Sequence, residues 1–91
     1  MRSDEAIFNW LQIKVVAMAR PQDAAATKTL EFFEQILLED FNISHIHIEH
    51  SSDTYSVHYD IEGAIHNKQY RQQLVEQLLT DIETNPKYNE A

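Results

Sequence analysis

The fold class is decided by residues 43–61, which read ISHIHIEHSSDTYSVHYDI. In 43–49 and again in 54–61, apolar side chains alternate with polar ones, which is the period of a β-strand with one buried face. The four residues between these runs are His, Ser, Ser and Asp, a composition typical of a turn. The stretch therefore predicts two antiparallel strands, 43–49 and 54–61, joined as a hairpin.

Apolar residues on both sides of this hairpin follow the period of an α-helix. Three helices are expected, over residues 3–20, 23–40 and 65–84, with a frayed tail at 86–91. Pro21 disfavours helical geometry in the residue before it and so ends the first helix. Asp23 is the expected N-cap of the second helix, and Gly63 is expected to end the second strand.

These elements predict one small α+β domain, residues 1–91, in the order α-α-β-β-α. The antiparallel β-hairpin is expected to pack against the three helices. A chain of 91 residues with 43% hydrophobic content is the right size for a single domain with a modest core.

The first predicted helix carries more apolar surface than one neighbour can cover. A surface helix usually has a single apolar stripe, whereas residues 3–20 carry two. The second stripe includes Trp10, Ile13 and Ala17, and a two-stranded sheet leaves both of its edges unpaired. We therefore expect a homodimer that uses Trp10, Ile13 and Ala17, a sheet edge, or both.

The charge of the chain is strongly negative and unevenly distributed. Fifteen Asp and Glu against seven Lys and Arg give a formal net charge of -8. No Lys or Arg lies between Lys28 and Lys68, although that stretch carries eight carboxylates. Such a field repels nucleic acid and anionic membranes and attracts a protein with a basic surface. The candidate partner-binding residues are on the polar side of the second helix: Glu31, Phe32, Glu34, Glu39 and Asp40.

All five histidines lie in the same acidic stretch. A four-residue hairpin loop would place His45 opposite His58, with His47 on the same solvent-facing side. Glu49 and Asp60 would share that side. Imidazole and carboxylate groups bind zinc, so these five residues form a candidate metal site. The alternative is an ordinary solvated face, because exposed histidines bind metal weakly unless hydrogen bonds fix their rings.

The sequence favours a non-enzymatic function. Having no Cys and one Gly, the chain lacks a cysteine nucleophile and a glycine-rich phosphate loop. We expect a cytoplasmic protein, because polar residues interrupt the apolar run at 7–19 as in an amphipathic helix rather than a signal core. The leading hypothesis is a small acidic regulatory domain that acts on a basic protein, in the manner of an inhibitor or an immunity protein. No nucleic acid or membrane partner is expected, and zinc is the one cofactor considered. The alternatives are a metal- or pH-responsive protein that uses the histidine face, and a structural homodimer or assembly subunit.

Overall fold

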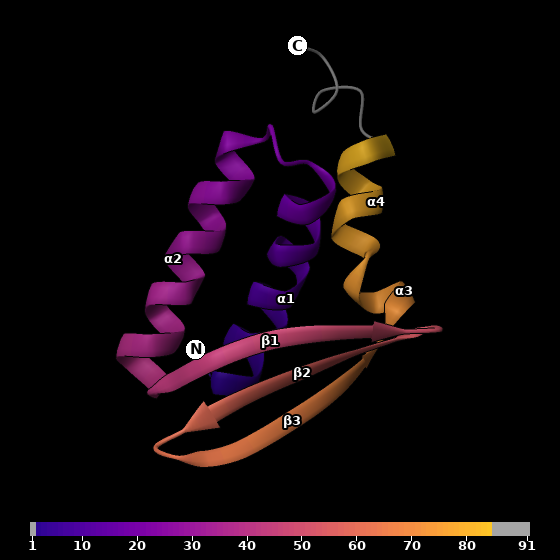
Figure 1. Cartoon of the computed structure of the whole chain (residues 1–91). Helices are drawn as coiled ribbons and strands as arrows, with labels where there is room; N and C mark the ends of the chain where they lie inside the picture. The colour runs from indigo at the N-terminus through magenta and orange to yellow at the C-terminus, as the bar shows by residue number, and fades with distance from the viewer. Residues whose placement is uncertain (1, 85–91) are drawn as a thin grey trace.

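The computed structural model describes residues 2–84, so the expected tail at 86–91 lies outside the described residues. The elements are α1 (Ser3–Ala19), α2 (Ala24–Phe41), β1 (Ile43–Ser51), β2 (Thr54–Ile61), β3 (Ala64–Arg71), α3 (Gln72–Val75) and α4 (Gln77–Thr84). Figure 1 shows all the helices on one side of a three-stranded antiparallel sheet with strand order β1-β2-β3. The α+β class and the hairpin of β1 and β2 are confirmed.

The two ends of α2 are fixed by local hydrogen bonds. The Asp23 carboxylate accepts the backbone N–H of Ala26 at 3.0 Å, which confirms the predicted N-cap and lowers the pKa of Asp23. At the other end Asn42 takes a left-handed backbone, with φ of 56°, and its N–H donates to the Leu37 carbonyl. A left-handed C-cap of this kind ends a helix and turns the chain into the next element, here β1.

The register of the first hairpin differs from the expected one. The loop has two residues rather than four, because Ser52 adopts a φ of 52° and Ser51 pairs with Thr54. His47 therefore lies opposite His58, and His45 does not. A register irregularity between Ser44 and His47, where His45 has a φ of 53°, removes His45 from the regular pairing.

The helix expected over 65–84 is wrong in its first part, where the chain forms β3. Glu62 and Gly63 both have positive φ, 50° and 86°, and Ile61 pairs with Ala64. Two successive left-handed residues make the tight turn that joins antiparallel strands, so Gly63 turns β2 back into β3 instead of only ending a strand. The rest of that region is helical, as expected, but Glu76 divides it into α3 and α4.

Helix α1 lies at the centre of the core. Its Ile7 and Leu11 belong to a buried cluster that includes Val57 of β2. Ile13 and Val16 belong to a second cluster, which includes Ala26 of α2 and Ile82 of α4. The expectation that this helix faces more than one neighbour is thus confirmed.

The same packing corrects the expected self-association surface. Trp10 is 1% exposed and Ile13 is 8% exposed within the single chain, while Ala17 packs against the second cluster. Trp10 and Ile13 are therefore wrong as dimer contacts, because α2, α4 and the sheet already cover them. A homodimer formed through another surface stays a prediction.

The conformation of Gly63 generates a stability test. An added Cβ at this position would meet nothing within 4 Å, so Gly63→Ala changes the backbone preference alone. We expect this variant to lower the free energy of unfolding by about 1–2 kcal/mol, the cost of a left-handed backbone for an L-residue. Glu62→Asn is the matched variant and should raise stability, because Asn tolerates a positive φ better than Glu. Urea unfolding midpoints measure both, and an unchanged midpoint for Gly63→Ala would contradict the left-handed turn.

Candidate functional site

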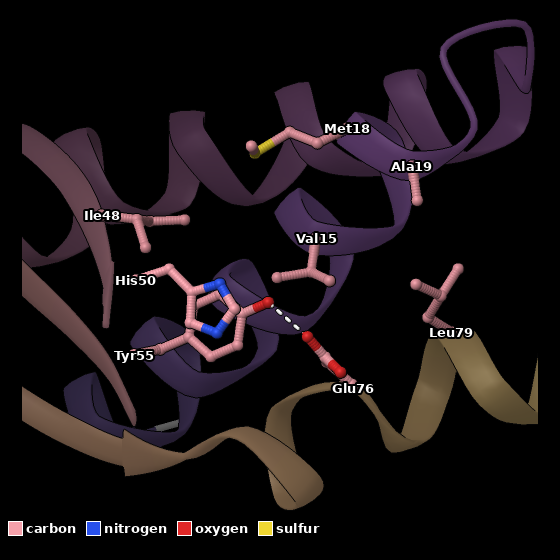
Figure 2. A pocket seen from close by; sticks show the side chains of 8 residues that line it. All are labelled: Val15, Met18, Ala19, Ile48, His50, Tyr55, Glu76 and Leu79. Carbon is pink, nitrogen blue, oxygen red and sulfur yellow. Dashed lines mark hydrogen bonds between the residues drawn. The ribbon is translucent and has the colours of Figure 1, made fainter. Parts of the chain in front are cut away.

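A pocket of about 450 Å³ lies where α1, the first two strands and the start of α4 meet. Figure 2 shows the side chains that line it: Val15, Met18, Ala19, Ile48, His50, Tyr55, Glu76 and Leu79. Most of these side chains are apolar, and the volume falls within the range of known ligand pockets. The pocket therefore has the size and lining of a recognition site.

Three polar side chains are held together on one wall of this pocket. The Tyr55 hydroxyl donates a hydrogen bond of 2.5 Å to a Glu76 carboxylate oxygen (Figure 2). The His50 ring stacks on Tyr55 with centroids 4.1 Å apart, and its Nε2 lies 2.6 Å from the Gln72 amide oxygen. Burial and the hydrogen bond to Glu76 raise the pKa of Tyr55 to about 12, so the phenol remains a donor at neutral pH.

A second pocket, of about 380 Å³, continues the first along β1. It is lined by Trp10, Lys14, Met18, Glu34, Ile46, His47 and Ile48. Met18 and Ile48 line both pockets. We call the two together the α1–β1 groove. Its walls are mainly apolar, and Met18, which is 66% exposed, stands between its two halves.

Of the five predicted partner-binding residues, Glu34 is the one that lines this groove. Its carboxylate accepts a hydrogen bond of 3.3 Å from Trp10 Nε1. Glu31 and Leu38 are three residues before and four after Glu34, so they lie on the same flank of α2. That flank therefore combines carboxylates with Leu38, which is 57% exposed.

The other predicted partner-binding residues are exposed but lie elsewhere around α2. Phe32, Glu39 and Asp40 are not among the residues that line either half of the groove. Phe32 is 60% exposed and packs edge-on against Phe33. The acidic face is thus divided between the groove rim and a side of α2 that points away from it.

The predicted five-residue metal cluster is also divided. His47, Glu49 and His58 have donor atoms within 4.8 Å of one another on the outer face of the sheet. His45 and Asp60 instead form a separate pair, with Nδ1 and Oδ2 3.1 Å apart. The shorter hairpin loop causes this division, because it places His47 rather than His45 opposite His58.

His58 leaves one polar atom without a hydrogen bond. Its Nε2 is buried and has no hydrogen-bond partner, which is true of no other side-chain atom among the described residues. Glu49 Oε2, at 3.6 Å, is in ion-pair range but beyond hydrogen-bond range. An unsatisfied buried polar atom costs about 1–3 kcal/mol, so a water molecule or an ion that bonds to this nitrogen would be stabilising.

The α1–β1 groove has no counterpart in the sequence-based predictions. Met18, His50, Tyr55 and Glu76 come from three elements and a helix junction, and no local pattern links them. The sequence feature that bears most on the groove is the alternation of polar and apolar residues in β1. In the observed register, Ile48 and His50 are turned toward the helices.

No protein-family model matches the sequence, and neither curated proteins nor solved structures gave a match. Within residues 2–84, no helix is both long enough and apolar enough to cross a membrane. Function must therefore be inferred from the geometry of these sites.

The hydrogen bond between Tyr55 and Glu76 predicts a pH-dependent contribution to stability. A folded-state pKa raised to about 12 means that this contribution is present below pH 10 and is lost as pH rises toward 12. Tyr55→Phe should lower the free energy of unfolding at neutral pH by about 1–2 kcal/mol and weaken the alkaline loss. Urea unfolding at several pH values measures this.

Tyr59→Phe is the matched control for that experiment. Tyr59 is equally buried, but its hydroxyl makes no hydrogen bond to another described residue. We expect Tyr59→Phe to cost less than Tyr55→Phe at neutral pH. Equal losses in the two variants would contradict a stabilising role for the Tyr55–Glu76 bond.

Proposed function

We propose that this chain is a protein-binding domain that holds a segment of a basic partner protein in the α1–β1 groove. The observation that carries the proposal is a mainly apolar groove of two adjoining pockets with carboxylates on its border. Met18 and Ile48 join its two halves, while Glu34 and Glu76 line it at separate points.

Apolar contact supplies the anchoring part of the proposal. Met18 is more than half exposed and Leu79 is partly exposed beside the buried Val15, so a bound apolar side chain would remove Met18 and Leu79 from water. Methionine is flexible and polarisable, and it adapts to partner surfaces of different shape. A buried apolar anchor surrounded by polar groups is the usual arrangement of an interface hot spot.

Charge supports a basic partner rather than an acidic one. Lys14 is the one Lys or Arg among the residues that line the groove. The groove also lies within a chain of net charge -8, in which no cation occurs between Lys28 and Lys68. Complementary charge speeds encounter and excludes acidic competitors.

The position of β1 favours an extended segment as the bound form. Within the described sheet, β1 pairs with β2 alone, so its other edge has backbone groups without a strand partner. A segment that adds to this edge directs every second side chain, about 7 Å apart, to the face where the groove lies. Backbone pairing would then supplement the apolar contacts.

In this proposal the domain regulates or inhibits its basic partner in the cytoplasm. The size and the negative charge of the chain are typical of small inhibitors of basic proteins. A structural homodimer is the second function suggested by the sequence, and the same β1 edge would be available to it.

Site-specific photo-crosslinking tests the proposal and identifies the partner in the same experiment. A benzoylphenylalanine placed at Met18 in the source cells should give a discrete adduct with a basic protein. The same group at Ile65, which is 81% exposed on the outer face of the sheet, should give none. Higher ionic strength should reduce the yield at Met18, because salt screens the charge attraction.

A matched pair of charge changes makes the test specific to the groove. Glu34→Lys should reduce the adduct at Met18 several-fold, whereas Glu39→Lys on the outward side of α2 should not. Each carboxylate accepts one side-chain hydrogen bond, Glu34 from the buried Trp10 and Glu39 from the exposed Gln35, so circular dichroism of both variants checks that the fold is kept. Equal effects of the two variants, an acidic partner, a dimer adduct of this chain, or no adduct at Met18 would each overturn the proposal.

A further inference from the structure

We propose that His47, Glu49 and His58 form a zinc site on the outer face of the sheet. This inference does not rest on the proposed protein-binding function. The three side chains come from two adjacent strands: His47 pairs directly with His58 across β1 and β2, and Glu49 is two residues along β1 on the same face.

The distances between the donor atoms are close to those of a metal-bound set. Ligand atoms about 2.0–2.2 Å from a tetrahedral zinc lie about 3.3 Å from one another. Glu49 Oε2 and His58 Nε2 are already 3.6 Å apart, and all three donors lie within 4.8 Å of one another. His47 and Glu49 are exposed, so rotation of their side chains can close the remaining distance.

The state of the two histidine rings favours metal binding. His58 Nε2 is buried without a hydrogen-bond partner, and it points toward the carboxylate of Glu49. The His47 Nδ1 lies 3.3 Å from the backbone carbonyl of His45, which can only accept, so this nitrogen carries the hydrogen. The His47 Nε2 lone pair is then available to a metal. The two rings are stacked, with centroids 5.0 Å apart and 20° between their planes, so the exposed His47 ring has to turn for both lone pairs to reach one ion.

The chemistry of the donor set indicates which metal fits. Two imidazoles and one carboxylate suit zinc and related divalent transition metals, whereas magnesium and calcium prefer oxygen-only sites. Neither β1 nor β2, which supply the three donors, contains a Lys or Arg, so the field at these donors attracts cations. Three protein donors leave a fourth tetrahedral position for water.

Zinc titration of the chain, without an affinity tag and after treatment with a chelator, tests the site directly. Calorimetry should give one zinc ion per chain, with no comparable binding of magnesium. In proton NMR, the imidazole signals of His47 and His58 should shift on saturation, while those of His50 and His66 should stay in place.

Two matched pairs of variants separate this site from its neighbours. In the histidine pair, His47→Gln should weaken zinc binding about tenfold or more, whereas His45→Gln should leave it unchanged. In the carboxylate pair, Glu49→Gln should weaken it by a similar factor, whereas Asp60→Asn should leave it unchanged. His47 and Glu49 are exposed, so these substitutions preserve the fold, and circular dichroism checks this. Absence of zinc binding, or equal losses within either pair, would overturn the inference.

Discussion

The burial of α1 on several sides is the constraint on which the rest of the structure depends. Ala6, Leu11 and Val16 have no exposed surface, and they are spaced five residues apart. At about 100° per residue, each of them points about 140° away from the one before, so three directions around the helix are closed. No single neighbour can cover three directions. Helix α2, helix α4 and the sheet therefore all pack against α1, and together they bury its different sides.

The α1–β1 groove lies where the elements that pack around α1 leave part of its surface exposed. The sheet and α2 cover the first half of α1, and α2 and α4 cover much of the second half, but none of them covers Met18, which lies beside Ile48 of β1. A corner between a helix and a strand edge leaves apolar side chains in contact with water. The hydrogen bond between Tyr55 and Glu76 holds β2 to the junction of α3 and α4, and so fixes one wall of that corner.

Strand β1 contributes to both proposed sites because its side chains alternate between two faces. Ile48 and His50 line the groove, while His47 and Glu49 extend from the outer face toward His58. A zinc ion on the outer face would link β1 to β2 and restrain the strand whose inner face forms the groove. His47 borders both regions, since it also lines the second half of the groove.

The sequence by itself determined the features that depend on residues a few positions apart. These are the periods of the first two helices and of β1 and β2, the Asp23 cap, and the burial of α1 on more than one side. Tertiary structure alone decided the third strand, the hairpin register and the groove. Strand β3 depends on a turn at Glu62 and Gly63 and on pairing with β2, and the donor set of His47, Glu49 and His58 depends on a loop of two residues rather than four. Period and capping are encoded locally, whereas a register or a pocket wall is fixed by contacts between residues far apart in the chain, where a shift of one pairing changes which side chains meet.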